Sequence, residues 1–342
     1  MLSACEVIGN SDFMNPLRLR TEIEVWPLAR PFSITGYTSE SVEVLVVTLE
    51  RDGHVGRGES AGVYYRSDEP GTMIRQIDSL RTTIESGINR DVLQRLLPPG
   101  GARNALDCAL WDLEAKLAGR AVWEMAGLQK PRPLLTTFTC GADDPETMAS
   151  IARGYGSARA IKIKLTGEGC DADRVRAVRS ARADVWLGVD ANQGFSRETL
   201  DRLMPVLLEA QVALIEQPFP IGQEFLLDDL RSPIPVAADE SVQDSRDLPA
   251  MVGRFEVVNI KLDKCGGLTE GLAMVRMAHE LGLAAMVGNM GGTSLAMAPA
   301  VVVGQLCSVV DLDGPVILKA DRTPRAEYSD GLITCPDALW GV

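Results

Sequence analysis

The sequence predicts an α/β protein in which a TIM-like (β/α)8 barrel follows a smaller α+β domain. Beyond about residue 125, eight short apolar runs alternate with segments of helical periodicity, the pattern of successive βα units. Runs such as VVNIKL are apolar on both faces, as strands are when helices cover a parallel sheet. The chain has 342 residues. Such a barrel takes roughly 250 residues, so about 100 remain for the second domain.

The first part of the chain favours a small antiparallel sheet followed by helices. Residues 17–62 contain the strand-like runs TEIEVWPL and EVLVVTLE, and Asp52-Gly53 is typical of a hairpin turn. Residues 70–95 and 101–118 then repeat apolar positions with a helical period. This order of elements predicts the α+β domain.

Pro131 and Pro133 follow these helices and indicate a domain boundary near residues 125–133. The predicted segments are a capping domain, a barrel and a C-terminal segment that returns to the capping domain, over residues 1–125, 126–320 and 321–342. The first 15 residues carry acids and asparagines without a basic start, so we expect a frayed extension and not a signal peptide.

Eight strands are predicted for the barrel, with helical patterns such as TLDRLMPVLLEA between them. Their ranges are 135–140, 160–165, 185–190, 212–216, 235–238, 256–261, 284–288 and 307–311. An open doubly wound sheet is the structural alternative. It would normally carry a glycine-rich fingerprint after its first strand, whereas GYGSARA at 154–160 precedes a strand.

A charged residue ends each of five successive strands. Lys164, Asp190, Glu216, Asp239 and Lys261 follow one another at steps of 26, 26, 23 and 22 residues. The C-terminal ends of the strands are where a (β/α)8 barrel builds its active site. The spacing therefore predicts that these five side chains meet at the mouth of the barrel.

The three acids in this series predict a metal site. Asp190, Glu216 and Asp239 lie on consecutive strands, close enough to converge on one ion, and carboxylates suit a hard cation such as Mg²⁺. We expect one Mg²⁺ per chain. The alternative is that each acid caps the helix that follows it.

The lysines on either side of the acids are candidates for proton transfer. Lys164 precedes the three acids by one strand, Lys261 follows them by one, and Lys162 shares a strand face with Lys164. A buried lysine beside other cations can act as a general base. Two bases around a metal suit removal and return of a proton α to a carboxylate. Structural salt bridges to the acids are the alternative, and Lys264 is a second candidate base.

Asp311 and Asp313 form a D-x-D after the eighth strand, and period-two alternation turns both side chains the same way. They are candidates to bind a cationic group such as a free ammonium. The alternative is turn chemistry in DLDGP, which this motif alone favours.

Composition narrows the functional classes. The net charge of −13 argues against nucleic acid and anionic membranes as partners. Seven cysteines without C-x-x-C, several in apolar runs, favour reduced thiols and a cytoplasmic location. No apolar run is long enough to span a membrane. With only two histidines, His54 and His279, neither at a strand end, a zinc site or a catalytic triad is disfavoured.

These motifs together resemble the muconate-lactonizing branch of the enolase superfamily, over nearly the whole chain. The resemblance rests on the K-x-K at Lys162/Lys164, the three acids, the K-x-D at Lys261/Asp263, and the helical run ARNALDCALWDLEAKLAG. It implies an enolase-like barrel with a capping domain, and lysine bases with Mg²⁺ are the known chemistry of that superfamily. The lack of a histidine base separates the chain from the mandelate-racemase branch.

Within the branch, NIKLDKCGGLTEGLA and DLDGP look most like the dipeptide epimerases, including those of the L-Ala-D/L-Glu type. The resemblance implies an isomerase that epimerises dipeptides through two lysines and a metal-stabilised enolate, in cell-wall peptide metabolism. It also implies that the D-x-D binds the dipeptide's α-ammonium. The further substrate contacts implied are Asp263, Thr139, Asn289 and Met290.

Alternatives stay open at this stage. The same superfamily includes N-succinylamino acid racemase, o-succinylbenzoate synthase and muconate cycloisomerase. Outside it, a metal-free Schiff-base aldolase barrel and a non-catalytic binding module are alternatives. The Ala-Glu epimerases carry an arginine in the first capping loop, where this chain has Ser39, and Arg30 and Arg66 are nearby but do not match. The preferred dipeptide and homo-oligomerisation are therefore left open.

Overall fold

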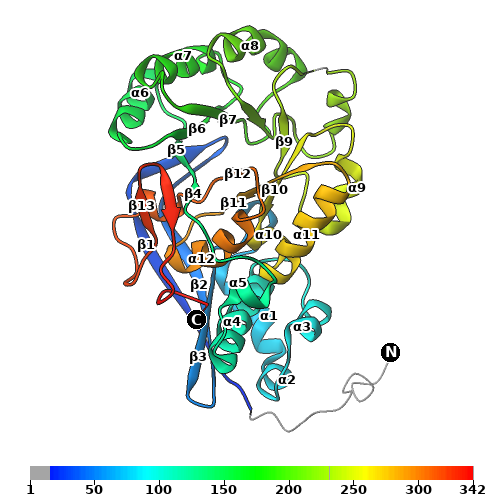
Figure 1. The fold of residues 1–342 in the computed structure, drawn as a ribbon. Coiled ribbons are helices and arrows are strands. Elements are labelled where there is room, and N and C mark those ends of the chain that lie inside the picture. The colour runs from blue at the N-terminus through cyan, green and yellow to red at the C-terminus, as the bar shows by residue number, and fades with distance from the viewer. Residues whose placement is uncertain (1–15, 231, 342) are drawn as a thin grey trace.

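The computed structural model describes residues 16–230 and 232–341 (Figure 1). The expectation for the first 15 residues lies outside this part of the chain. The chain begins with an antiparallel sheet in the order β1-β2-β3. These strands are β1 (Arg18–Ile34), β2 (Tyr37–Arg51) and β3 (His54–Ser60). The helices that follow are η1 (Tyr64–Arg66), α1 (Pro70–Ser79), α2 (Arg81–Glu85), α3 (Arg90–Leu96), α4 (Gly101–Ala118) and α5 (Val122–Met125).

Local sequence explains how this domain is built. Asp52 and Gly53 have φ of 51° and 77°, the positive values that the predicted tight hairpin turn needs. Helix α4 packs directly on β3, because a Cβ at Gly56 or Gly58 would lie 2.3 or 2.1 Å from carbonyl oxygens of α4. The buried α4 therefore joins the cap's own core to the rest of the molecule.

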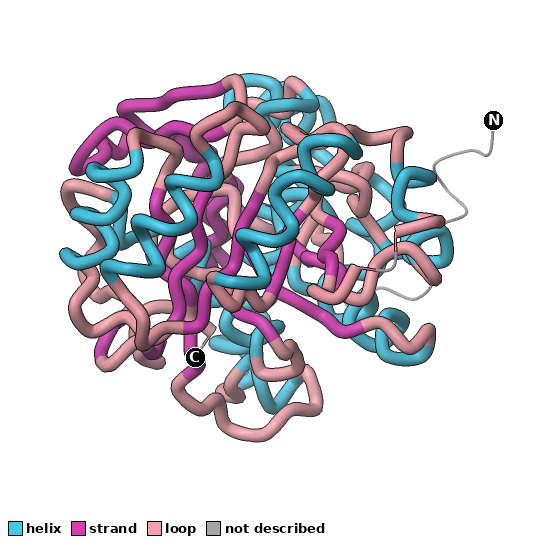
Figure 2. Tube along the Cα trace, turned by 90° about the horizontal axis from the view of Figure 1, so that it is seen from above, coloured by secondary structure: helices cyan, strands magenta, loops and turns pink. Residues whose placement is uncertain are grey.

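The second part of the chain is an eight-stranded parallel sheet in the order β12-β11-β10-β9-β8-β7-β6-β5. Its strands are β5 (Thr137–Cys140), β6 (Ala160–Lys164), β7 (Trp186–Asp190), β8 (Leu214–Glu216), β9 (Val236–Ala238), β10 (Val257–Lys261), β11 (Ala284–Gly288) and β12 (Val309–Val310). Figure 2, a view from above, shows helices lying outside these strands. The predicted fold class, a barrel with an N-terminal capping domain, is confirmed.

The helices around the barrel are unequal. The long ones are α6 (Pro145–Gly154), α7 (Asp171–Ala181), α8 (Arg197–Glu209), α11 (Leu268–Glu280) and α12 (Ser294–Gly304). The short ones are η2 (Glu224–Leu227), η3 (Ser245–Asp247), α9 (Leu248–Met251), α10 (Leu262–Cys265) and η4 (Gly314–Ile317). The helix after β8 is thus reduced to a 3-10 turn, since Pro218, Pro220 and the tight turn at Gly222 interrupt that segment.

Side chains close the seam between the first and last strands of the barrel. The backbone N–H of Leu312 donates to Thr136 Oγ1 at 2.9 Å, and that of Thr139 donates to Asp313 Oδ2 at 2.6 Å. The Thr137 hydroxyl donates to the Asp311 carboxylate. The D-x-D motif therefore has a structural role in joining β12 to β5.

The capping domain lies over the C-terminal ends of the barrel strands. The Thr35 hydroxyl lies 3.1 Å from Leu165 O, just after β6, and 3.0 Å from Ala191 O, just after β7. Gln243 Nε2 lies 3.2 Å from the Tyr65 hydroxyl. These contacts place β1, β2 and η1 above the strand ends.

The end of the chain returns to the capping domain. After β13 (Glu327–Ser329) and β14 (Leu332–Thr334), which pair antiparallel with β4 (Leu134–Leu135), Trp340 Nε1 donates to Arg57 O at 2.9 Å. Gly341 N donates to Asp112 Oδ1 at 2.7 Å. The domain limits themselves stay a prediction. None of the helices described has the length and apolar character needed to cross a membrane.

Candidate active site

A cavity of about 710 Å³ lies where the capping domain meets the strand ends. The barrel contributes charged residues from the ends of its strands, Lys162, Lys164, Asp239 and Lys261 among them. The capping domain contributes Tyr37 and Ser39 from β2 and Tyr64 and Tyr65 from η1. The rings of Tyr37 and Tyr64 stack with centroids 4.7 Å apart, so an aromatic wall faces the barrel mouth.

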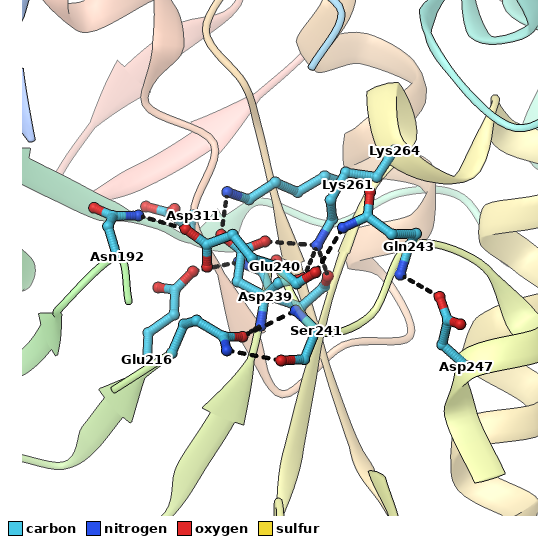
Figure 3. A network of polar contacts seen from close by, with 12 residues as sticks. Asn192, Glu216, Asp239, Glu240, Ser241, Gln243, Asp247, Lys261, Lys264 and Asp311 are labelled. Carbon is cyan, nitrogen blue, oxygen red and sulfur yellow. Dashed lines mark hydrogen bonds and ion pairs between the residues drawn. The ribbon is translucent and has the colours of Figure 1, made fainter. Parts of the chain in front are cut away.

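The three predicted acids meet at the bottom of this region. Carboxylate oxygens of Asp190, Glu216 and Asp239 all lie within 4.8 Å of one another, and the three residues are at most 2% exposed. Figure 3 shows Glu216 and Asp239 side by side at the ends of their strands. An oxygen-only set of this size fits a hard divalent cation and lacks the nitrogen or sulfur ligands typical of zinc.

Each carboxylate is bonded to a lysine in the structure. Lys164 Nζ lies 2.5 Å from Asp190 Oδ2, and Lys261 Nζ lies 2.7 Å from Asp239 Oδ2. Lys162 Nζ lies 2.9 Å from Glu216 Oε2. Since Lys164 ends β6 and Lys261 ends β10, the two ammonium groups flank the acids on opposite sides, as the spacing predicts.

The electrostatics of the site depend on this pairing. Burial opposes the charge on Lys261, but Asp239 and Glu216 outweigh it and raise the pKa of that lysine. Burial likewise opposes the charge on Asp239, but Lys261 and Lys264 lower its pKa overall. The pKa of Glu216 is raised by burial and by Asp190 beside it. Lys261 and Asp239 are therefore held charged, whereas Glu216 resists ionisation.

Lys264, the second candidate base, is placed differently from Lys261. Its Nζ lies 2.5 Å from both Asp239 O and Asp239 Oδ1 (Figure 3). It also lies 3.0 Å from Asn259 O. It is 1% exposed and does not line the cavity. Its geometry is that of a residue that holds Asp239 in place.

The D-x-D residues lie on the far side of Lys162. Lys162 Nζ is 2.5 Å from Asp311 Oδ2, so Asp311 is already paired with a cation. Burial, and Asp311 nearby, raise the pKa of Asp313 to about 6. Both residues line the cavity, together with Thr139, Asn289 and Met290.

Three residues of interest lie elsewhere. The Asp263 carboxylate is not in the cavity wall. Its Oδ1 accepts hydrogen bonds from Ser60 Oγ, Ala61 N and Gly62 N at 2.6, 2.9 and 3.1 Å. It thus holds the loop after β3, and does not lie where a substrate contact would. Arg66 is 3.1 Å from Gln243 Oε1, and neither it nor Arg30 lines the cavity.

Polar residues that sequence reasoning passed over complete the site. Asn259 Nδ2 donates to Glu216 Oε1 at 2.7 Å, and Gln217 Oε1 accepts from Asp239 N at 2.9 Å. Glu240, beside Asp239, is 2% exposed, and burial together with Asp239 and Asp190 raises its pKa to about 8. Asn259 was within reach of the sequence, because it lies two residues before Lys261 and so shares its strand face.

Comparison with known protein families agrees with this geometry. Residues 18–127 match the N-terminal domain of the mandelate racemase/muconate lactonizing enzyme family, and residues 146–339 match the enolase C-terminal domain-like family. The chain belongs to this family, within the enolase superfamily. The resemblance predicted from the K-x-K and the three acids is confirmed.

Characterised members of the family are similar along most of their length. The L-Ala-D/L-Glu epimerase of Escherichia coli K12 is 37% identical over 310 residues, 90% of this chain and 96% of that protein. The N-acetyl-D-glutamate racemase of a Pseudoalteromonas species is 37% identical over 302 residues, 87% and 95% of the two chains.

A solved structure is also closely similar. An enolase family member from Agrobacterium tumefaciens, described as homologous to dipeptide epimerases and determined with sodium and L-Ala-L-Glu, superposes with a TM-score of 0.92. It is 38% identical and covers 95% of this chain and all of its own. The described residues therefore have the fold of the enolase superfamily in both the capping domain and the barrel.

Proposed function

We propose that this protein is an isomerase, a Mg²⁺-dependent dipeptide epimerase that inverts the carbon α to the substrate's carboxylate. The observation that carries the proposal is the pair of ammonium groups, Lys164 and Lys261, flanking three buried carboxylates at the bottom of a cavity. The names of the family members at 37% identity support the same reaction class.

Asp190, Glu216 and Asp239 would hold one Mg²⁺. When bound, the cation supplies positive charge to the substrate's carboxylate as negative charge develops there. It would also compete with Lys164 and Lys261 for Asp190 and Asp239, the acids to which the lysines are now bonded. The lysines would then be free to face the substrate.

The two lysines would perform the proton transfers. One, in its neutral form, takes the α-proton onto Nζ, and the electrons of that C–H bond pass into the carboxylate to give an enediolate. The other, in its ammonium form, returns a proton to the opposite face of the same carbon. Lys162, between Glu216 and Asp311, would keep positive charge next to the reacting group.

The α-ammonium group of the dipeptide would bind to the D-x-D motif, Asp311 and Asp313. Asp311 is paired with Lys162, so Asp313 is the better placed carboxylate for an α-ammonium. A second candidate function depends on whether Asp313 binds an ammonium group. If Asp313 binds no ammonium, the site suits racemisation of N-acylamino acids, which the Pseudoalteromonas relative's name also supports.

The cavity also bears on which dipeptide is preferred. On the capping-domain side its charged lining residues are Glu43, Asp68 and Glu69, and Ser39 also lines it. No lysine or arginine from that domain lines the described cavity. A neutral or cationic second residue is therefore favoured over glutamate. We also propose a cytoplasmic location, which the free thiols of the described cysteines support, while homo-oligomerisation stays a prediction.

Deuterium uptake tests the proposal. The protein with Mg²⁺ in D2O would be given a library of L,X dipeptides and, as a matched set, N-acetylated amino acids. Exchange of the α-proton with inversion is expected for dipeptides with a free ammonium. Exchange confined to N-acetylated substrates would favour the second candidate, and exchange with no substrate would contradict both.

A further inference from the structure

Among the described residues, three buried oxygen atoms beside the three carboxylates have no hydrogen-bond partner: Asn192 Oδ1, Glu240 Oε2 and Asn259 Oδ1. Asn192 and Glu240 line the cavity, whereas Asn259, whose amide donates to Glu216, does not. Leaving a buried acceptor without a donor is energetically unfavourable. Two such acceptors on side chains that are bonded to each other therefore point to donors that bind beside them.

The two side chains are held toward each other. Asn192 Nδ2 donates to Glu240 Oε1 at 3.2 Å (Figure 3), which fixes the orientation of both groups and so of Asn192 Oδ1 and Glu240 Oε2. The Asn192 N–H in turn donates to Asp190 Oδ1 at 2.9 Å. Asn192 and Gln193 adopt φ of 41° and 68°, a left-handed backbone that is uncommon outside glycine. Gln193 N bonds to Gln217 O at 2.9 Å and so helps to hold this turn.

The nearest cations are already engaged. Lys164 Nζ is bonded to Asp190, and Lys261 Nζ to Asp239. Each of the two cavity-lining residues follows a carboxylate of the predicted metal site, Asn192 two places after Asp190 and Glu240 one place after Asp239. Both residues therefore lie next to the predicted metal site.

We infer that Asn192 and Glu240 accept hydrogen bonds from water molecules on the bound cation and so act as its outer-sphere ligands. The inference rests on the proposed function, which places a cation on Asp190, Glu216 and Asp239. Mg²⁺ keeps several of its waters when a protein binds it through a few carboxylates. Those waters are strong donors directed away from the ion, and two fixed acceptors orient them. The pair would thus raise affinity for a cation that holds its water.

Metal affinity of the substrate-free protein tests this with two variants. Affinity is measured at pH 9, where the Glu240 carboxyl with its pKa of about 8 is ionised. Glu240→Gln removes the acceptor and puts an amide donor toward the water, and Asn192→Ala removes the other acceptor without changing charge. Each should weaken Mg²⁺ binding by about 10- to 100-fold in calorimetry, the usual effect of losing an outer-shell partner. Affinity for Ca²⁺, which sheds water more readily, should fall less. Glu43→Gln, which removes the same charge from the opposite wall of the cavity, should change Mg²⁺ affinity less than 2-fold.

The results separate the possibilities. If Glu240→Gln weakens binding while Asn192→Ala does not, the effect is one of charge, and the inference is wrong. If both variants bind Mg²⁺ within 2-fold of the wild type, it is also wrong, while the proposed metal site stands. If the wild type binds no Mg²⁺, the metal site itself fails.

Wild-type protein gives a test that needs no folded variant. Water-proton relaxation of the Mn²⁺-loaded, substrate-free protein should report at least two waters on the ion. A result of no water on the ion would overturn the inference.

Discussion

Replacing Lys264 with methionine should lower the free energy of unfolding by about 3 to 5 kcal/mol, the cost of breaking a buried ion pair from one side. Lys264 Nζ is bonded to Asp239 O, Asp239 Oδ1 and Asn259 O, and the side chain is 1% exposed. Burial lowers the pKa of Lys264, so keeping its charge is itself unfavourable. Removing the Lys264 ammonium is nevertheless destabilising, because Asp239 Oδ1 and the Asp239 carbonyl oxygen then lose the hydrogen bonds that Lys264 donates to them.

The assay is urea unfolding followed by circular dichroism at pH 7.5 in EDTA, so that no cation compensates for the lost lysine. Lys116→Met is the matched control. Lys116 is also bonded to a buried carboxylate, at 2.8 Å, but it is 26% exposed, and Asp112 keeps hydrogen bonds from Arg57 N and Gly341 N. The control should lose about 1 kcal/mol or less. Equal losses in the two variants would refute the positioning role of Lys264.

Three further predictions concern the ammonium site, the metal and the cap. Asp313→Asn should raise KM for free-ammonium dipeptides by about 10- to 100-fold, since a hydrogen bond to a charged group is worth about 1.5 to 3 kcal/mol; steady-state kinetics should show no such change for N-acetylated substrates. Removing divalent cations with EDTA should abolish activity, and borohydride should trap no adduct; full activity in EDTA together with trapping would favour a Schiff base. Burial raises the pKa of Asp107 above its ordinary 3.8 to about 6, so its contribution to stability is greatest at low pH and is lost as pH rises from about 4 to about 6. Asp107→Asn should flatten that part of the stability curve, and an unchanged slope in pH-dependent urea titrations would contradict this reasoning.

The barrel and the converging charges were within reach of the sequence because both depend on short-range periodicity. Strand alternation puts Lys162 and Lys164 on one face, and the βα step brings Asp190, Glu216 and Asp239 to one edge. No other structural fact is needed for these two predictions.

Contacts between residues far apart in the sequence could not be predicted from the sequence. Asp263 matches a motif in the sequence, yet its partners Ser60, Ala61 and Gly62 lie about 200 residues earlier, as the separations of 203, 202 and 201 show. The same holds for the seam between β12 and β5. There Asp311 and Asp313 accept hydrogen bonds from Thr137 and Thr139 of the first barrel strand, which lie 174 residues earlier in the sequence. A linear pattern predicts which edge a side chain reaches, but not which partner it finds there.

The central claim, that two lysines serve opposite faces of one carbon, is tested most directly by isotope exchange in single-lysine variants. Lys164→Ala and Lys261→Ala would each be incubated in D2O with Mg²⁺ and with each epimer of the best substrate, and α-deuterium would be followed by NMR. Both variants should fail to epimerise, because one face then lacks its acid or base. Residual exchange should be confined to one epimer, and to opposite epimers in the two variants. Epimerisation at the wild-type rate by either variant would contradict the two-base account.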